Sequence, residues 1–292
     1  MIKRTLKFVL FLGVSLPWLA LAAETVEKTW SVSADARISV DNTAGEIVVR
    51  AWDRDEVHLI ADLGDSVKNL DIKESASGLQ IHVENRNARN TDASDLLLKV
   101  PAAALLDITG VSADIEISGL ENASVKASSV SGDVDVRANS ESVSLESVSG
   151  DVIFSGKTTR ISAESVSGDI ELTGVSGIVD ANTVSGDIEM RAGPLELGKF
   201  ETVSGDIKLT TGLSDNGKLG AQSMSGDISA KLPANLSGSF KAQSFSGRIS
   251  SDFGTVSKAS HGPGSHLKFV AGKGGAEIKV ESFSGNIRLQ ND

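Results

Sequence analysis

A tetrapeptide, Val-Ser-Gly-Asp, recurs through the middle of this 292-residue chain and constrains its fold more than any other feature. Five identical copies lie at 130–133, 148–151, 166–169, 184–187 and 203–206. Variants follow at 224–227, 245–248 and 283–286, and a degenerate forerunner lies at 111–114. The first residues of successive copies are 18 to 21 positions apart, except for a final gap of 38. A fixed period of this length predicts a repeat architecture in which each unit packs on its neighbours.

Apolar residues keep the same register around every copy. Counted from the first residue of the tetrapeptide, they stand at offsets −5, −3, 0, +4 and +6, as in Val143, Leu145, Val148, Val152 and Phe154. A spacing of two places side chains on one face of a strand. We expect all five positions to point inward, with one bend between offsets −3 and 0 and another at Ser-Gly, where glycine tolerates tight turns.

A repeat of about 18 residues with two short strands predicts one coil of a β-solenoid. A single coil cannot bury its apolar face, but stacked coils lie ~4.8 Å apart and pair every strand with its neighbours. β-Branched residues dominate and no period of 3.6 appears, so a helical fold is excluded. The sequence therefore predicts an all-β, single-stranded β-helix with coils of 18–21 residues.

The first 22 residues have the pattern of a Sec signal peptide. Lys3 and Arg4 precede an apolar run, 8–21, and the run ends in Ala20-Leu21-Ala22, a small-x-small cleavage pattern. The run is short for a membrane span, and no second one follows. We therefore expect export to the periplasm, the cell surface or the medium, with no membrane insertion after removal of the signal. An uncleaved N-terminal anchor is the alternative.

The remaining chain divides into two predicted parts. Residues 23–105 lack the tetrapeptide but alternate as strands, and we expect this irregular β segment to cap the solenoid, as repeat arrays require. Residues 106–292 are the solenoid repeats, with one enlarged coil and a protruding loop at about 251–275. The last coil, 282–292, would leave a strand edge unless the 254–275 loop covers it, and that edge could support self-association, edge to edge or end to end.

Composition narrows the partners. Removal of the signal and its three basic residues leaves 25 basic against 39 acidic residues, a net charge of −14. Such a chain is repelled by nucleic acid and by anionic lipid headgroups. Cysteine is absent, which excludes disulfides, thiolate metal sites and lipoprotein-type lipid attachment.

Three segments precede the run of Ser-Gly-Asp turns: 40–49, Ala51-Trp52-Asp53 and Leu98-Lys99-Val100-Pro101. With these segments the chain resembles a bacterial family of adhesin candidates of unknown function with β-strand repeats. The resemblance covers nearly all of the chain after the signal. It implies a right-handed, single-stranded β-helix and brings no catalytic residues. Arg248 and Asn286 depart from the Ser-Gly-Asp pattern.

One carboxylate per coil forms the sharpest candidate site. The aspartates of the tetrapeptide are Asp133, Asp151, Asp169, Asp187, Asp206 and Asp227. We expect them to lie in line, where each neighbouring pair repels by about 1 kcal/mol in bulk water. Hydrogen bonds from turn hydroxyls and backbone N–H groups are the favoured compensation. A row of bound cations such as Ca²⁺ is the alternative, although one aspartate per coil supplies few ligands.

The serine of the tetrapeptide also recurs in every coil. These serines are Ser131, Ser149, Ser167, Ser185, Ser204, Ser225, Ser246 and Ser284. A nucleophilic serine needs a base and an orienting group, and a residue in eight copies is no unique nucleophile. Beyond the signal the histidines are His58, His82, His261 and His266, in the N-terminal strands and the 251–275 region. We therefore assign the serines a structural role.

Three weaker signals are weighed in the same way. Glu171, Glu189 and Asp135 could form an acidic strip for polysaccharide cleavage, but paired glycosidase carboxylates need specific separations and one raised pKa. The nearby basic residues that could hold an acidic sugar are Arg137, Arg160 and Arg191. His261 and His266 lack an evident third metal ligand. For Trp30 and Trp52 we favour core packing over a sugar platform.

The sequence thus predicts a non-catalytic, exported binding or scaffold protein of the cell envelope without catalytic or cofactor-binding residues. Its partner would be an envelope protein or a glycan, held by repeated weak contacts. One alternative is a periplasmic module that recognises a partner through the N-terminal segment or the 254–275 loop. A polysaccharide lyase or hydrolase is the second alternative.

Overall fold

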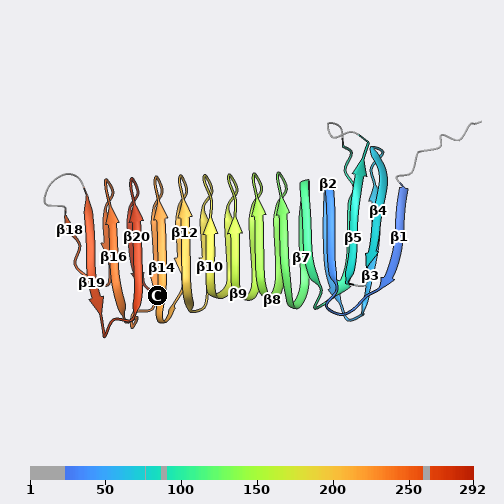
Figure 1. The fold of residues 1–292 in the computed structure, drawn as a ribbon. Coiled ribbons are helices and arrows are strands. Elements are labelled where there is room, and N and C mark those ends of the chain that lie inside the picture. The colour runs from blue at the N-terminus through green and yellow to red at the C-terminus, as the bar shows by residue number, and fades with distance from the viewer. Residues whose placement is uncertain (1–23, 76, 87–90, 259–263) are drawn as a thin grey trace, which may run out of the picture.

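The computed structural model describes residues 24–75, 77–86, 91–258 and 264–292, and every regular element in these ranges is a strand. Figure 1 shows one long, flat stack of coils with a broader group of strands at the N-terminal end. The predicted all-β solenoid is confirmed. The predicted signal peptide, 1–22, and His261 lie outside the described residues. No helix in the described part of the chain is long and apolar enough to cross a membrane.

Each central coil contributes to two strand stacks, which we call face A and face B. Face A contains the segment after each Val-Ser-Gly-Asp turn, and face B contains the segment before the next turn. The long strands are β2 (Arg37–Trp52), β7 (Leu105–Ser129), β8 (Val134–Ser147), β9 (Val152–Glu164) and β10 (Ile170–Asn182). They pair in parallel in the order β2-β7-β8-β9-β10.

Farther along, each coil is split into two shorter strands. On face A they are β11 (Ile188–Arg191), β13 (Ile207–Thr210), β15 (Ile228–Leu232), β17 (Ile249–Ser251) and β21 (Ile287–Asn291). On face B they are β12 (Leu195–Thr202), β14 (Leu213–Ser223), β16 (Gly238–Ser244) and β20 (Ala276–Ser282). All of these pairs are parallel, as stacked coils require.

The core lies between the two faces, where alternate side chains meet. Buried rows run along the stack, such as Val134, Val152 and Ile170 on face A, and each residue is directly paired with the next. Phe154 and Phe200 are completely buried in the same interior. Stacking of like residues therefore fills the narrow interior, in agreement with the pattern at offsets +4 and +6.

One part of the inward pattern is wrong. The valine at offset 0 was expected to point inward, yet Val166 is 44% exposed, whereas Ser165 directly before it is buried. Strand alternation continues through offset −1, so the bend follows that residue instead of preceding it. The sequence led to the wrong assignment because valine is the more apolar of the two residues.

The N-terminal strands lie against β2 at one end of the stack (Figure 1). They are β1 (Glu24–Ser31), β3 (Glu56–Leu63), β4 (Val67–Ser75), β5 (Gly78–Asn85) and β6 (Asp95–Pro101). β5 and β6 pair in parallel with β2, whereas β4–β5, β3–β6 and β1–β3 are antiparallel. The first solenoid strand thus has partners on both sides.

The last coil of the chain does not lie at the end of the stack. β20 pairs with β14 on one side and β16 on the other, and β21 lies in the same way between β15 and β17. The final coil is therefore inserted between two coils that precede it in the sequence. Our expectation that it ends the stack with a free edge is wrong, because both of its edges already have parallel partners.

The 251–275 region forms the route to this insertion. β18 (Ser257–Lys258) and β19 (Ser265–Ala271) pair with each other, and β19 is antiparallel to β16 on the side away from β20. A tight turn then returns the chain across β16, with positive φ at Gly272 and Gly274. Ser237 stabilises the crossing, because its Oγ donates to Gly274 O at 2.9 Å and accepts from Lys273 N at 3.0 Å. The region expected as one enlarged coil thus contains a reversed strand.

Candidate functional site

The corner between face B and face A is held by a buried hydroxyl. Ser165 Oγ accepts the N–H of Gly168 at 2.9 Å and donates to Gly150 O of the preceding coil at 3.3 Å. The same position is filled by Ser129, Ser147, Thr183, Thr202, Ser223, Ser244 and Ser282. One side chain therefore closes its own turn and joins it to its neighbour, which explains the recurrence of a hydroxyl residue at offset −1.

The glycine of the tetrapeptide is required by close backbone approach. A Cβ on Gly168 would lie 1.9 Å from Gly150 O, and a Cβ on Gly186 would lie 2.0 Å from Gly168 O. Neither contact can be relieved by a side-chain movement, because both partners are backbone carbonyls. Each coil therefore packs at its corner as closely as a residue without a side chain permits.

Because the corner is closed from inside by the hydroxyl, the residue at offset 0 is turned outward. These residues form one continuous row, here called the apolar ladder. In spatial order it consists of Val111, Val130, Val148, Val166, Val184, Val203, Met224, Phe283 and Phe245, each between 43% and 58% exposed. Neighbouring rungs are joined through the backbone, as in Ser167 N to Val148 O at 2.9 Å. Among the described residues, these nine account for all but two of the exposed large hydrophobic side chains.

The inserted coil contributes one of the two phenylalanines at the end of the apolar ladder where the side chains are largest. It brings Phe283 between Met224 and Phe245, which lie in coils that are consecutive along the chain. The rings of Phe245 and Phe283 stack with their centroids 4.8 Å apart and an interplanar angle of 6°. The ladder therefore runs from small valines at one end to a methionine and two stacked rings at the other.

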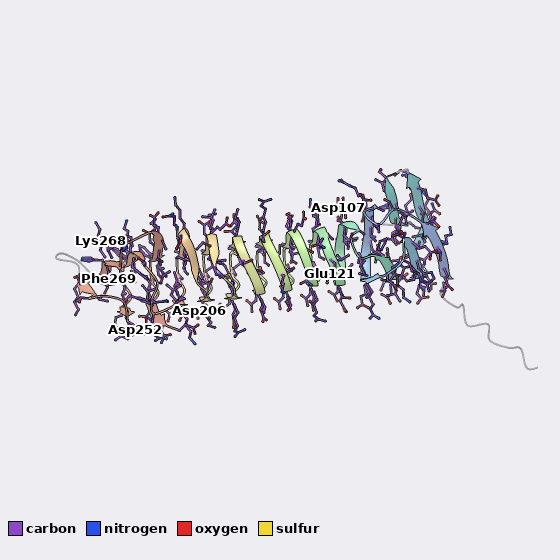
Figure 2. The ribbon with its side chains drawn as sticks, turned by 90° about the horizontal axis from the view of Figure 1, so that it is seen from below. Asp107, Glu121, Asp206, Asp252, Lys268 and Phe269 are labelled. Carbon is purple, nitrogen blue, oxygen red and sulfur yellow. The ribbon has the colours of Figure 1, made fainter. Side chains whose placement is uncertain are left out.

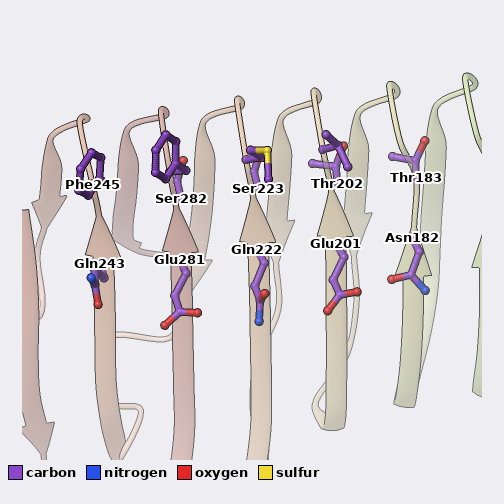
Figure 3. A pocket seen from close by; sticks show the side chains of 13 residues that line it. Asn182, Thr183, Glu201, Thr202, Gln222, Ser223, Gln243, Phe245, Glu281 and Ser282 are labelled. Atoms are coloured by element: carbon purple, nitrogen blue, oxygen red, sulfur yellow. The ribbon is translucent and has the colours of Figure 1, made fainter. Parts of the chain in front are cut away.

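A groove follows the apolar ladder on its face B side (Figure 3). Its larger section, of about 660 Å³, lies at the aromatic end, where Phe245, Phe283 and Met224 form one side. A smaller section of about 360 Å³ lies along Val130, Val148 and Val166. The floor of both sections is the buried hydroxyl row, and the outer wall is a polar row at offset −2. In order, the wall in these two sections contains Ser128, Glu146, Glu164, Asn182, Glu201, Gln222, Glu281 and Gln243.

The two halves of the wall differ in charge. At the aromatic end, Glu201 and Glu281 form ion pairs with Lys199 and Lys279 at 3.0 and 2.8 Å. The hydrogen bond that Lys199 donates to Glu201 raises the pKa of Lys199, so this lysine stays charged. Glu146 and Glu164 in the valine half lie outside the ion pairs found in the described part of the chain. The groove is therefore acidic at its valine end and closer to neutral at its aromatic end.

The aspartate row lies on the other side of the turn and carries a regular set of bonds. Asp151 Oδ1 accepts the backbone N–H of Asp169, and Asp169 Oδ1 accepts that of Asp187, at 2.8 and 2.7 Å. Asp133, Asp187 and Asp206 accept from the next coil in the same way. The structure thus brings the six predicted aspartates into one line, with an acceptor role for each carboxylate.

The departures from Ser-Gly-Asp occupy the end of this row. Asp227 accepts the N–H of Asn286 at 2.7 Å, and Asn286 Oδ1 accepts the N–H of Arg248 at 3.1 Å. Arg248 belongs to the outermost coil on this face, so no further N–H needs a side-chain acceptor there. The spatial order therefore explains both substitutions: an amide oxygen can replace the carboxylate inside the row, and the last position needs no oxygen.

No cluster of three or more His, Cys, Asp or Glu side chains suited to a metal ion occurs within the ranges that the structure covers. Each coil contributes a single carboxylate to the aspartate row. One oxygen of each carboxylate already accepts a backbone N–H of the next coil. A Ca²⁺ row at Asp133–Asp227 stays a prediction of the sequence alone.

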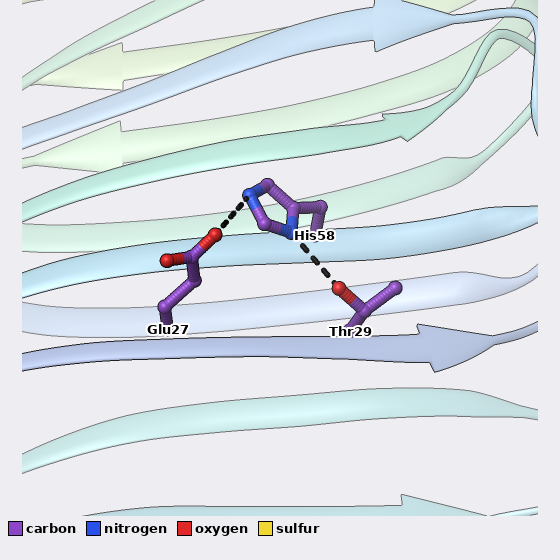
Figure 4. Close-up of polar contacts among 3 residues, drawn as sticks. All are labelled: Glu27, Thr29 and His58. Atoms are coloured by element: carbon purple, nitrogen blue, oxygen red, sulfur yellow. Dashed lines mark hydrogen bonds and ion pairs between the residues drawn. The ribbon is translucent and has the colours of Figure 1, made fainter.

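The predicted serine row, which includes Ser131 and Ser167, is exposed at the tips of the turns. The histidines of the N-terminal strands are far along the chain from these turns. His58 of β3 is half-buried, with Nδ1 2.9 Å from Oγ1 of Thr29 and Nε2 3.4 Å from Oε1 of Glu27, both on the neighbouring strand β1 (Figure 4). Thr29 is also the direct strand partner of His58, so its backbone is part of the sheet. Glu27, Thr29 and His58 line neither section of the groove beside the apolar ladder.

The acidic strip considered for glycan cleavage is interrupted. Asp135 pairs with Ile153, and Ile153 with Glu171, so an apolar side chain separates the two carboxylates. Burial raises the pKa of Asp135, the nearby Arg137 lowers it and Glu116 raises it further. Glu171 and Glu189 are direct neighbours, and Arg191 pairs with Glu189. Asp135 therefore has Glu116 as its direct carboxyl neighbour, and Ile153 separates it from Glu171 and Glu189, the residues with which the strip was expected to form.

Both tryptophans lie in the N-terminal strands. Trp30 packs against the core, as expected. Trp52 is half-buried, its Nε1 donates to Glu56 O at 2.8 Å, and the Arg54 guanidinium and Lys99 ammonium lie 5.1 and 5.8 Å from its ring centroid. Cations cover this ring, so it is not a bare platform for a sugar.

Figure 2 shows side chains along both sides of the stack, including Lys268 and Phe269 of β19. His266 lies on the same strand, opposite Gln243. His261, which was weighed with it as a metal ligand, lies outside the described residues.

The sequence interpretation missed the apolar ladder and the groove. A signal was present: a hydroxyl residue stands at offset −1 in eight coils, and the residue at offset 0 grows from valine to methionine and phenylalanine. Offsets −5, −3 and −1 have the same parity, so the hydroxyl residue continues the inward face of the strand and the residue at offset 0 points outward.

Comparisons with known proteins agree with the architecture. The model of the Toastrack DUF4097 family matches residues 36–290. No curated protein matches the chain. A solved structure of a candidate lipid-binding protein from Parabacteroides distasonis ATCC 8503 is similar at 15% identity and a TM-score of 0.53, over 91% of this chain and 96% of that one. A candidate adhesin from Bacteroides fragilis NCTC 9343 matches at 14% identity and a TM-score of 0.48, over 91% and 97%.

Proposed function

Because this chain belongs to the Toastrack DUF4097 family, we propose that it is an exported, non-catalytic solenoid of the cell envelope that binds its partner through the apolar ladder. The observation that carries the proposal is the ladder itself. Nine large apolar side chains stand exposed in one continuous row beside a groove. Soluble proteins rarely expose such contiguous apolar surface unless it contacts something.

The chemistry of the turns supports a binding role over catalysis. The buried hydroxyl and the aspartate of the corner both make structural bonds: the hydroxyl to glycine, and the aspartate to the next backbone N–H. An enzyme needs a unique group with a perturbed pKa placed beside a pocket. Here the groove walls repeat the same contacts from coil to coil, which suits an extended partner that makes many similar contacts.

One structural neighbour is described as a candidate lipid-binding protein, which raises lipid as a class of partner. In the valine half of the groove, Glu146 and Glu164 form the outer wall. Carboxylates beside an apolar row repel the anionic headgroups of most bacterial lipids. We therefore favour a protein partner, and export by the predicted signal, 1–22, gives it access to the envelope.

The test measures retention on isolated envelopes of the producing cells. The chain from residue 23 onward is compared with a variant in which Val148, Val166 and Val184 are changed to Thr, which keeps the side-chain shape but adds a hydroxyl. We expect retention to fall several-fold, because the row loses apolar surface. The matched control changes Ser149, Ser167 and Ser185 to Ala, which are exposed at the next position of the same turns.

Unchanged retention of the threonine variant would contradict the proposal. Vesicles of zwitterionic and anionic lipid provide a second arm. Ladder-dependent binding to them would replace the protein partner with a lipid surface.

A further inference from the structure

We propose that the apolar ladder docks onto the ladder of a second copy of this chain, with the two solenoid axes antiparallel and Val184 of both copies at the two-fold axis. The inference rests on the proposed function, because it names the partner of the same surface. Three properties of the surface support it: the repeat distance of the ladder, its gradient of side-chain size and the charge of the groove wall beside it.

The repeat distance selects the kind of partner. The rungs follow the coil spacing of ~4.8 Å, so nine rungs extend over about 38 Å. Side chains on one face of an extended strand repeat at about 6.6 Å, and an α-helix has a pitch of about 5.4 Å. Either partner would lose register within a few rungs. Another β-stack has the same repeat and stays in register along the full row.

The gradient of side-chain size selects the direction. Val184 is the fifth of the nine rungs, so an antiparallel pair centred there places Val130 opposite Phe283 and Val148 opposite Met224. Large residues then face small ones along the interface, which keeps the distance between the two stacks even. In a parallel pair Phe283 would face Phe283 and Val130 would face Val130. The two phenylalanines would then hold the stacks apart and leave a gap between the valines at the other end.

The charge of the groove wall favours the same direction. Antiparallel docking places Glu146 opposite Gln222, and Glu164 opposite the Lys199–Glu201 ion pair. A two-fold axis along the solenoid would instead place Glu146 and Glu164 opposite the aspartate row of the other copy, and like charges at a closed interface cost affinity. The aspartate row itself does not select a direction, because in the antiparallel pair Asp187 would lie opposite its own copy, where one of its carboxylate oxygens accepts the backbone N–H of Asp206.

The absence of cysteine from the sequence makes the geometry directly testable. In the chain from residue 23 onward, Val184→Cys should cross-link with itself, because the two copies of this rung meet at the axis. Val130→Cys alone should not, since its partner rung is Phe283. A mixture of Val130→Cys and Phe283→Cys proteins should form the mixed disulfide dimer.

The control is Ser155→Cys, an exposed position on face A away from the ladder. Cross-linking of Val184→Cys should exceed that of the control by at least about tenfold in rate, through the effective concentration in a preformed dimer. Sedimentation of the unmodified protein should show a concentration-dependent dimer. Val184→Asp should raise its dissociation constant at least about tenfold, because two carboxylates would meet on the axis.

The outcomes separate this inference from the proposed function. A protein that stays monomeric, with a ladder that still determines envelope retention, would overturn the second copy as partner and leave the binding surface standing. Self-cross-linking of Val130→Cys as fast as Val184→Cys would overturn the antiparallel arrangement. A monomer whose retention ignores the ladder would overturn both.

Discussion

The central coils and the last coil make the same bonds with different neighbours along the chain. Between β8 and β12, each coil stacks on the one that follows it, and Ser165 bonds to a glycine 15 residues away. In the inserted coil, Ser282 makes the same bond to Gly226, which is 56 residues away. The corner contacts are therefore independent of chain order. A coil that carries the corner hydroxyl and glycine can therefore stack at any position in the solenoid. The connecting segments determine which position it takes.

The largest expected effect comes from a steric clash at one corner in each region, introduced by changing the corner glycine to alanine. Gly168→Ala places a Cβ 1.9 Å from Gly150 O, and Gly285→Ala places one 1.8 Å from Gly226 O. We expect each change to cost at least about 3 kcal/mol, the upper end of overpacking, because backbone must move. Gly168→Ala should disrupt the whole stack, whereas Gly285→Ala should release the inserted coil together with β16 and β17, which pair in parallel only with that coil.

Urea denaturation followed by circular dichroism, together with limited proteolysis, separates these results. Ser167→Ala, at an exposed position next to Gly168, is the control. A release of only local structure by Gly168→Ala would show that the central coils are as separable as the last one.

The comparison is sharpened by removal of the buried hydroxyl in each region. Ser165→Ala leaves the N–H of Gly168 and the carbonyl of Gly150 without their bonds, and Ser282→Ala does the same at Gly285 and Gly226. Each change should reduce the free energy of unfolding by about 1–3 kcal/mol. Hydrogen exchange at the amides of Gly168 and Gly285 measures the local effect. Equal protection in the variants and the unmodified protein would contradict the role assigned to the hydroxyl.

A weaker effect is expected on the outer side of the corner. Val166→Asp changes a side chain that is 44% exposed, so the fold should lose less than about 1 kcal/mol. Ala163→Asp, three residues earlier and fully buried, should unfold the coil, because a carboxylate would be buried without a partner. Thermal melts of the two variants provide the measurement. If the melting temperature of Val166→Asp is as low as that of Ala163→Asp, Val166 belongs to the core and its outward assignment is wrong.

The smallest effect concerns the outward row of face A, where Asp135 occupies the position that Arg288 fills in the inserted coil. Burial raises the pKa of Asp135 in the folded protein, so ionisation of this carboxyl weakens the fold. The penalty is absent at a pH below the pKa of the unfolded chain and grows as the pH rises through that value and the folded one. Asp135→Asn should therefore stabilise at neutral pH and lose this advantage in acid.

Melting temperatures across the acidic range test this sign. Arg288→Gln is the matched control, since arginine does not titrate there. A stabilisation by Asp135→Asn that persists unchanged at the lowest pH would show that charge is not its cause.

The sequence was sufficient for the solenoid, because the period of 18 and the β-branched pattern are properties of every coil. It was also sufficient to align the aspartates. It failed at Val166 because hydrophobicity alone does not report that Ser165 closes the corner from inside. It failed at the last coil because identical corners stack with equal ease, so the period could not reveal that Phe283 lies between Met224 and Phe245. The groove depends on both facts and was missed for both reasons.

The inserted coil also determines how the rod would respond to tension. The C-terminus leaves the stack from an internal coil, between β15 and β17, instead of from its end (Figure 1). A pull at the C-terminus would therefore load the strand bonds of β21 on both edges at once, in shear. The outer coil, with β16, β17 and β19, would lie beyond the loaded strand. Because the force does not act directly on this coil, it would continue to hold the outer edge of the inserted coil.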